Sequence, residues 1–323
     1  MNILYVTNMY PHEGHPYYGI FVKEQIEAIN ALNGSEGREI SSKVIFINSK
    51  KTLLVYLWSI VSINFHLIFN RYDVIHIHYG LSGLFLLFNP FIRIPVVITF
   101  HGGDIQKERD RSVQRFISSK LAKKAAICIV LNDKMEDAVK KTGGKTLLAP
   151  CGIDTNIFNN TPQNENKNEG YTVVFPGSSE IAVKNYPLFK EVINEAERIL
   201  KSEINIIEIK NMTRSDVAQA LNDADCLLMT SFSEGSPQII KEAMACNLPV
   251  VSTNVGDVSD QISGVDNCYI AKENRTESLL EPLLTVLHSG RRSENSRNMV
   301  FDKGLDSGSV AVKIFESYRS LLK

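Results

Sequence analysis

The sequence lacks the features of several protein classes. Its 323 residues include five cysteines, with no CxxC spacing, so neither a disulfide framework nor a cysteine zinc site is expected. No GxGxxG follows a predicted strand, which removes support for a nicotinamide dinucleotide site. A net charge of −1 makes bulk nucleic-acid binding unexpected. With 44% hydrophobic and 22% charged residues, the composition predicts a soluble globular protein of about two domains.

Long apolar runs are also scarce, and the longest one has two interpretations. Leu53 to Phe69 is 17 residues long and contains polar side chains, which is short of the about 20 residues that span a bilayer. A buried helix is the favoured interpretation. The alternative is an interfacial anchor, because Lys50, Lys51 and Arg71 flank the run.

Charge is distributed unevenly between the two halves. Residues 1–160 carry 18 Lys/Arg against 13 Asp/Glu, whereas the rest carries 17 against 23. The basic N-terminal half has two interpretations: scattered surface charge, or docking on an anionic membrane surface. The chain enters a predicted strand at once, with no basic region of a signal peptide, so we expect a cytoplasmic protein that is peripheral on the inner face of the membrane in the second case.

The clearest local pattern runs from Cys226 to Asn254. An apolar run predicts a strand, Ser231–Pro237 a polar loop, the next residues a helix, and Val250–Ser252 a second strand. In such a unit of a parallel sheet, the loop and the helix N-terminus face the ligand side. Glu234 and Glu242 bracket this turn, so we expect them to hold hydroxyl groups while the helix N-terminus holds a phosphate.

Other predicted loops at strand carboxyl ends supply further candidates. His101-Gly-Gly-Asp104 offers an imidazole and a carboxylate, with a capping Asp104 and a structural His101 as the alternative. Gly19 lets a backbone approach a phosphate, or is an ordinary turn glycine. Gly177 and its following serines, with Lys184, offer donors and a cation to a diphosphate; a solvated lysine is the alternative.

Two patterns that could bind metal are set aside. His76 and His78 share one face of a predicted strand, but no third ligand has a matching local spacing, so a packed strand end is favoured. Asp223 and Asp225 form a DxD sequence, but it precedes a buried strand at the end away from the ligands. No metal site and no cofactor is therefore expected.

The longest segment that resembles a known family lies in the second half of the chain. EGSPQIIKEAMACNLPVVSTNVGD, Glu234 to Asp257, resembles the E-x7-E signature of retaining glycosyltransferases of family 4, which have the GT-B fold. Further segments agree in order and extend the resemblance over nearly the whole chain: Gly19-Ile-Phe-Val, His76-Ile-His78, His101-Gly-Gly-Asp104, Pro150-Cys-Gly-Ile-Asp154, Val183-Lys-Asn-Tyr186 and Ala224-Asp-Cys226.

The resemblance implies an α/β chain of GT-B architecture, with two Rossmann-like parallel-sheet domains facing a cleft. We expect an acceptor-side domain at 1–160, a donor domain at 161–308, and a C-terminal helix at about 309–323 that packs back on the first domain. The polar stretch 159–170 is the predicted linker.

The resemblance also implies a role for each candidate residue. Glu242 would bind the ribose, Lys184 the leaving diphosphate, and His101 the transferred sugar, while Gly19 would leave room for phosphates. Glu234 would bind the sugar and diphosphate. The remaining donor-binding residues are Gly177, Ser178, Met212, Gly235, Ser236 and Pro237. The family commonly pairs the lysine with an arginine after the loop glycine, where this chain has Ser178 and Ser179; Lys210 and Arg214 are candidate replacements.

The function implied is retaining, metal-independent transfer of a sugar from a UDP- or GDP-sugar to a hydroxyl of a glycan or lipid-linked acceptor, in cell-surface polysaccharide or glycolipid synthesis. Two alternatives stay open. A nucleotide-sugar 2-epimerase shares the two-domain architecture, and a non-catalytic protein could keep the nucleotide-sugar pocket as a scaffold or sensor.

Overall fold

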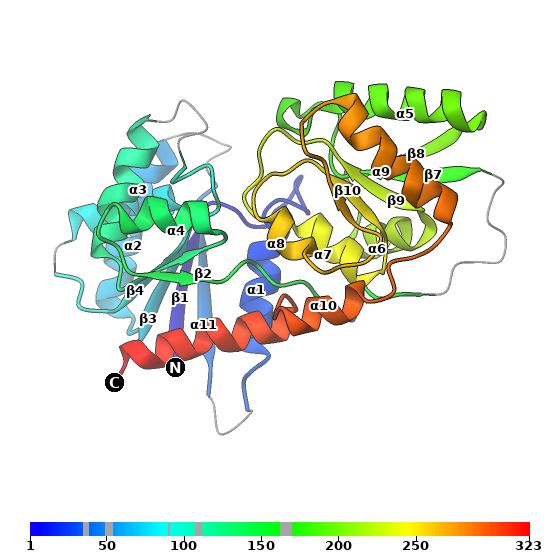
Figure 1. Cartoon of the computed structure of the whole chain (residues 1–323). Coiled ribbons are helices and arrows are strands. Elements are labelled where there is room, and N and C mark those ends of the chain that lie inside the picture. Colours follow the sequence, from blue (N-terminus) through cyan, green and yellow to red (C-terminus); the bar gives the residue numbers. More distant parts are fainter. Residues whose placement is uncertain (35–38, 49–53, 90, 107–111, 162–169) are drawn as a thin grey trace. The chain divides into compact units, whose positions relative to one another are not determined.

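The computed structural model describes residues 1–34, 39–48, 54–89, 91–106, 112–161 and 170–323. The chain divides into two compact units. Unit 1 comprises Met1–Gly152 together with Ser307–Lys323, and unit 2 comprises Ile153–Asp306. Figure 1 shows a layered α/β arrangement within each unit.

Unit 1 is built on a six-stranded parallel sheet in the order β2-β1-β3-β4-β5-β6. Alternate residues of β1 enter opposite cores, Ile3 and Tyr5 on one face and Leu4 and Val6 on the other, as the two-residue period of a strand requires. The strands are β1 (Asn2–Thr7), β2 (Ser41–Phe46), β3 (Val74–His78), β4 (Val96–Thr99), β5 (Ile127–Val130) and β6 (Thr146–Leu148).

Helices cover both faces of this sheet. One face packs against α1 (Ile20–Asn30) and the C-terminal helix α11 (Ser307–Leu321), which contact each other. The other face packs against α2, the 3₁₀ helix η2, α3 and α4. Their bounds are Leu54–Phe69, Gly80–Phe88, Ser112–Lys124 and Asp133–Lys140.

Unit 2 repeats the plan with a five-stranded parallel sheet in the order β11-β10-β9-β7-β8. Its strands are β7 (Tyr171–Phe175), β8 (Ile204–Glu208), β9 (Cys226–Met229), β10 (Val250–Ser252) and β11 (Tyr269–Ile270). One face packs against α5 (Tyr186–Leu200) and α9 (Thr276–Ser289). The other packs against α6 (Arg214–Asp223), α7 (Gln238–Ala245), α8 (Val258–Ile262) and α10 (Ser296–Asp302).

Unit 2 begins earlier in the sequence than the polar stretch indicated. Ile153 and Phe158 are fully buried in its core, and Arg297 donates hydrogen bonds to the carbonyls of Phe158, Ala245 and Thr155. One guanidinium thus holds two carbonyls of this segment on α10 and ties them to the end of α7. Most of the predicted linker at 159–170 lies outside the described residues.

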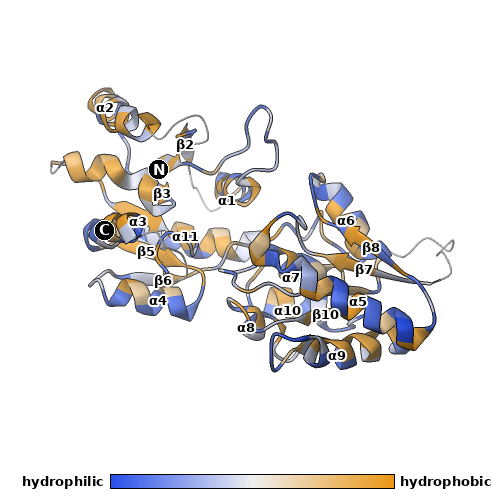
Figure 2. Cartoon of the chain, turned by 90° about the horizontal axis from the view of Figure 1, so that it is seen from above, coloured by the Kyte–Doolittle hydropathy of each residue, from blue (hydrophilic) through white to orange (hydrophobic). Residues whose placement is uncertain are grey.

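The predicted buried helix at Leu53 to Phe69 needs correction. Tyr56 and Ile63 of α2 are buried against the sheet, but many large apolar side chains of this helix are exposed. In Figure 2 the ribbon of α2 is largely hydrophobic in colour. Across the part of the chain that the structure describes, no helix is both long enough and apolar enough to cross a bilayer.

His76 on β3 is a packed strand residue, as the sequence favoured. Its Nδ1 lies 2.6 Å from the Tyr318 hydroxyl of α11, and its Nε2 lies 2.7 Å from Thr99 Oγ1. Both ring nitrogens are therefore engaged by neutral groups. Burial lowers the pKa of His76 from 6.5 to about 3, so the folded protein holds this imidazole neutral.

This burial predicts a pH dependence of stability. The folded pKa of His76 lies below its unfolded value, so the unfolded state binds more protons between about pH 6.5 and pH 3. As the pH is lowered through this range, this one group should lower the free energy of unfolding by up to about 1.4 kcal/mol per pH unit. His76→Gln should make the pH slope from urea unfolding shallower, whereas His15→Gln, at an exposed position, should leave it unchanged. Equal slopes in all three proteins would contradict the prediction.

Candidate functional site

The sheet of unit 2 has a topological switch point beside β7. From β7 the chain goes to β8 on one side, and from β8 it crosses to β9 on the other side of β7. The loops that leave β7 and β9 therefore diverge at the carboxyl edge. In open parallel sheets this is where ligands bind.

An ion pair joins these two loops. Lys184 Nζ, at the end of the 3₁₀ turn η3 (Ala182–Lys184), lies 2.7 Å from Glu234 Oε1 in the loop after β9. The Ser231 hydroxyl donates to the same oxygen at 2.8 Å, and the Phe232 amide donates to the Val183 carbonyl at 2.9 Å. Both charged side chains keep some exposure, 18% and 16%, so the pair is braced by neighbours but open to a ligand.

The loop then enters α7 through Pro237, whose missing N–H costs nothing at a helix start. The Ser236 hydroxyl does not face solvent freely, because it donates to Asp257 Oδ2 at 2.8 Å and accepts from Gln261 Nε2 at 3.2 Å. Lys241, fully buried, also reaches Ser236 Oγ at 3.4 Å.

Gly235 lies where the loops after β9 and β10 pack closely. Its carbonyl oxygen would lie 2.5 Å from a Cβ at Gly256.

Glu242, on the buried side of α7, pairs with Arg214 at the start of α6. Arg214 Nη2 lies 2.7 Å from Glu242 Oε1, and only 3% of the Glu242 side chain is exposed. The Arg214 guanidinium also lies over the Phe158 ring, 4.5 Å from its centroid. Arg214 therefore supports the carboxylate predicted to hold ribose.

The loop after β7 owes its path to Gly177. Its φ is +148°, and a Cβ there would lie 3.1 Å from Lys184 Cε, so the glycine leaves room for the lysine chain. Ser178 Oγ accepts the Glu180 amide at 3.3 Å, and Ser179 donates to Glu208 Oε1 from its amide and hydroxyl. These serines organise the loop where the family commonly has an arginine.

Of the two candidate replacements for that arginine, Lys210 lies beside this loop. Lys210 Nζ is 2.8 Å from Glu180 Oε1, and both side chains are exposed. Arg214, by contrast, is held at Glu242. Met212, between them in sequence, is partly buried against the core of unit 2.

Two further candidates belong to unit 1. His101 Nε2 lies 3.3 Å from His78 Nδ1, the two rings are stacked, and burial lowers the pKa of His101 to about 3. Gly19, at the start of α1, has φ +65°, and a Cβ there would fall 2.3 Å from the Met9 carbonyl carbon. A close backbone approach inside the protein thus explains this glycine.

Asp104 has the capping role that the sequence left as an alternative. Its two oxygens accept the amides of Gly80 and His101, at 2.9 and 3.0 Å. It is fully buried, and burial raises its pKa to about 6. Asp104 therefore holds the His101 loop rather than facing a ligand. The DxD residue Asp225 is likewise structural, since it accepts the Thr172 amide at 2.8 Å.

The structure therefore brings Lys184, Glu234 and Gly177 together and adds partners that sequence reasoning missed. Ser231 braces Glu234, and buried Asp257 and Lys241 anchor the loop that carries Ser236. Asp257 stands in the quoted VGD segment, which was the available signal. No sequence signal indicated the burial of Lys241, because a lysine within an amphipathic helix is expected to be solvated.

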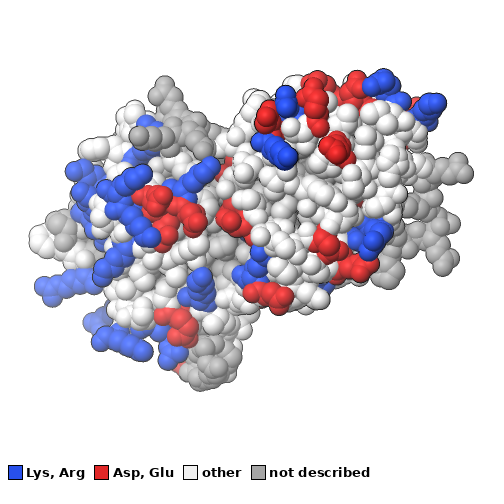
Figure 3. Space-filling view, in the orientation of Figure 1, with Lys and Arg blue, Asp and Glu red and all other residues white. Residues whose placement is uncertain are grey.

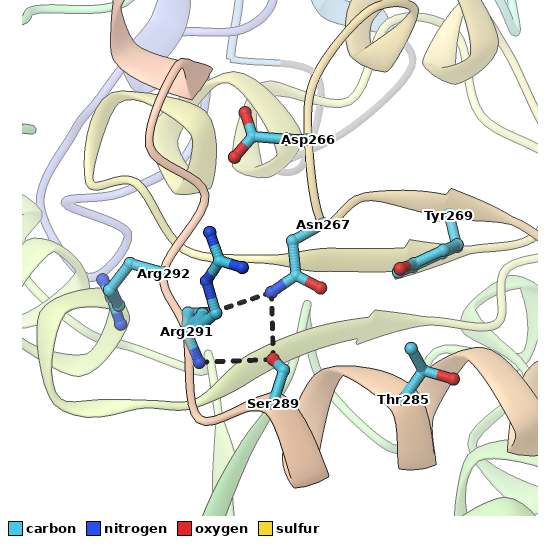
Figure 4. Close-up of a pocket in the computed structure, with 7 residues that line it drawn as sticks. All are labelled: Asp266, Asn267, Tyr269, Thr285, Ser289, Arg291 and Arg292. Carbon is cyan, nitrogen blue, oxygen red and sulfur yellow. Dashed lines mark hydrogen bonds between the residues drawn. The ribbon is translucent and has the colours of Figure 1, made fainter.

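A hollow of unit 2, of about 250 Å³, lies away from these loops, between β11 and the end of α9 (Figure 4). Its polar groups serve the fold. Asn267 Nδ2 donates to the Arg291 carbonyl at 2.7 Å, and Arg292 donates to the carbonyls of Ala224, Leu221 and Cys246. This hollow therefore needs no ligand to explain its residues.

Two family models match the chain in tandem. The glycosyltransferase family 4 model matches residues 23–157, and the glycosyl transferases group 1 model matches residues 159–300. The chain belongs to the family-4 glycosyltransferases. Its expected GT-B fold class is confirmed by the two parallel-sheet units and by the structural neighbours described next.

Curated relatives of this glycosyltransferase are distant. It is 22% identical over 279 residues to TuaC of Bacillus subtilis, whose name describes a glycosyltransferase of teichuronic acid biosynthesis; 78% of this chain and 71% of TuaC are covered. It is 27% identical over 247 residues to a D-inositol 3-phosphate glycosyltransferase of Paenarthrobacter aurescens. That match covers 60% of this chain and 59% of the relative.

Solved structures share the fold of the glycosyltransferase. Sucrose-phosphate synthase of Thermosynechococcus elongatus superimposes with a TM-score of 0.78 at 16% identity, covering 99% of this chain and 98% of that one. Alr3699/HepE of Anabaena, in complex with UDP and glucose, has a TM-score of 0.73 at 15% identity. There the match covers 99% of this chain and all of that chain.

The Arg214–Glu242 pair predicts a loss of stability when it is broken. Arg214→Gln leaves a nearly buried carboxylate without its cation, which should lower the free energy of unfolding by about 3 kcal/mol. Adding Glu242→Gln should restore much of the loss, and a double-mutant cycle in urea measures the coupling. Lys210→Gln, at an exposed pair, serves as the control and should cause no measurable change. Additive effects of the two substitutions would contradict the prediction.

Proposed function

We propose that this glycosyltransferase moves a sugar from a UDP- or GDP-sugar to a hydroxyl group of a glycan or lipid-linked acceptor, with retention and without a metal ion. It would act in the cytoplasm, peripherally on the inner face of the membrane, in cell-surface polysaccharide or glycolipid synthesis. In the reaction the bond between the anomeric carbon and the diphosphate oxygen breaks, and a bond to the acceptor oxygen forms.

The Lys184–Glu234 pair at the switch point carries this proposal. The leaving group is a nucleoside diphosphate, whose negative charge grows as the bond breaks. Lys184 offers the cation that stabilises this charge, and the start of α7 offers backbone N–H groups with partial positive charge. Glu234 offers a carboxylate that accepts sugar hydroxyls, at the other end of the same ion pair.

Glu242 is the proposed ribose ligand. A carboxylate can accept hydrogen bonds from two neighbouring hydroxyls. The Glu242 carboxylate is held in place by Arg214 and by its buried position on α7. Gly177, Ser178, Met212, Gly235, Ser236 and Pro237 would line the donor through their backbone. The amides of Gly235 and Ser236 lie in the loop that leads into α7, so main-chain donors suit the diphosphate there.

His101 is proposed to contact the transferred sugar as a neutral imidazole. Its lowered pKa keeps it uncharged at neutral pH, so it can donate or accept a hydrogen bond but supplies no charge. This suits a hydroxyl partner. The retained configuration is proposed to arise by front-face transfer, in which the donor phosphate helps to take the acceptor proton.

Neighbouring structures support a uridine nucleotide as the first donor to test. Alr3699/HepE was crystallised with UDP and glucose and also with UDP-glucose. The named role of TuaC in teichuronic acid synthesis supports a cell-surface glycan acceptor.

The experiment is incubation of the pure protein with a panel of UDP- and GDP-sugars and a membrane lipid extract. Release of nucleoside diphosphate together with a glycosylated product supports the transferase. A product with the same anomeric configuration as the donor supports retention. Epimerised donor in the absence of any acceptor would instead establish the 2-epimerase. Tight donor binding with no turnover of any kind would establish a binding protein.

Two substitutions should separate binding from turnover. Glu242→Ala should raise the KM for the donor by about tenfold or more, because a charged hydrogen-bond acceptor for ribose is lost. Lys184→Ala should lower kcat by about 10²-fold or more, because the cation acts on charge that develops in the transition state. Lys272→Ala, at an exposed position of unit 2, is the control. Wild-type kinetics in both variants would refute the site assignment.

A further inference from the structure

The helix α2 exposes apolar side chains where a surface helix normally exposes polar ones. Trp58 is 69% exposed, Phe65 61% and Ile68 73%. We define the outward face of α2 as Leu54, Leu57, Trp58, Val61, Phe65, Ile68 and Phe69, all of which are more than half exposed. At about 100° per residue these seven lie within an arc of about 120°.

The opposite side of the helix makes the pattern unusual. Tyr56, Ser59 and Ile63 are buried against the sheet. The polar side chains of α2 are turned to its flanks and interior: Ser59 donates to the Tyr56 carbonyl, and Asn64 donates to the Ile60 carbonyl. A helix that is apolar on two opposite sides is normally covered on both, so the outward face indicates an occupant.

Neighbouring elements extend the apolar surface. The helix η2 contacts both α2 and α3, and Asn89 at its end donates to Asn64 Oδ1 of α2 at 2.8 Å. Phe88 and Phe91 beside this contact are 63% and 86% exposed. A hollow of about 310 Å³ follows, lined mainly by apolar residues between the end of η2 and the start of β4, with Lys124 as its charged member.

Around α2, η2 and α3, basic side chains outnumber acidic ones among the described residues. Arg71 follows α2, Arg93 follows η2, and Lys120, Lys123 and Lys124 stand on α3; all are exposed. Among the described residues between 54 and 126 the acidic side chains are Asp73, which accepts the Asn2 amide, and buried Asp104. Figure 3 shows Lys and Arg gathered over the side of unit 1 that carries α3.

We propose that the outward face of α2 docks unit 1 on an anionic lipid membrane, lying in the interface with its basic neighbours on the headgroups. Apolar and aromatic side chains bordered by cations match the two layers of such a surface, acyl chains and anionic headgroups. The helix lies on the membrane and does not cross it, because 16 residues span about 24 Å, short of the about 30 Å core.

Trp58 is the single tryptophan of the chain and stands on this face, so its fluorescence reports the contact directly. The intact protein is titrated with phosphatidylcholine vesicles, with and without about 30% phosphatidylglycerol. The expected result is a blue shift of emission, and quenching by bromine-labelled lipid, with the anionic vesicles. No shift and no flotation with either vesicle would overturn the proposal.

Variants distinguish the apolar and the charged parts. Phe65→Ser with Ile68→Ser retains the Trp58 probe and should weaken vesicle binding about tenfold or more. Arg93→Ala with Lys123→Ala should weaken binding to anionic vesicles about fivefold or more. Ile199→Ser, which alters an exposed apolar residue of unit 2, should bind like the wild type. Unchanged binding in the Phe65/Ile68 variant would overturn the assignment to α2.

A second copy of the chain is the competing occupant. In that case Trp58 emission would shift with protein concentration in the absence of lipid, and sedimentation would show a dimer that the Phe65/Ile68 substitutions abolish. That result, without vesicle binding, would also overturn the proposal. The proposal rests on the membrane association in the proposed function, but its measurements do not use the transfer reaction, so their failure would leave the proposed sugar transfer untouched.

Discussion

The contact between Lys184 and Glu234 is the constraint on which the candidate site depends. It joins two loops that leave neighbouring strands, and hydrogen bonds from Ser231 and Phe232 close the same seam. Since both loops are anchored at their strands and to each other, the start of α7 is held in one direction. A ligand that separates this pair must give Lys184 an anionic oxygen and give Glu234 a hydrogen-bond donor; in the proposed function the diphosphate supplies the first and a sugar hydroxyl the second.

The sequence predicted the parallel sheets and the loop residues because those depend on local signals. Lys184 and Glu234 stand in the connections that follow strands marked by apolar runs, and Glu242 stands in the helix that comes next. The partners of these residues depend on distant parts of the chain: Arg214 reaches Glu242 from another helix, and Phe158 lies beneath it. Spacing along the chain contains no record of such contacts. The burial of Lys241 escaped prediction for the same reason.

The interpretation of α2 shows where hydropathy alone fails. An apolar helix with short polar residues reads as buried, and one side of α2 is. Which side meets solvent depends on how many layers the fold stacks above it, and in unit 1 no described element covers that side. The structure thus corrects the favoured interpretation: the predicted helix forms, but only one of its sides is buried.

The placement of α11 sets the order in which the two units are completed. Ser307–Leu321 packs on α1 and supplies Tyr318 to buried His76, yet it is synthesised after all of unit 2. During translation the unit 2 sequence can fold as soon as it emerges, while the face of the unit 1 sheet that carries α1 still lacks its second helix. Loss of this last helix by truncation would therefore damage the first unit and spare the second.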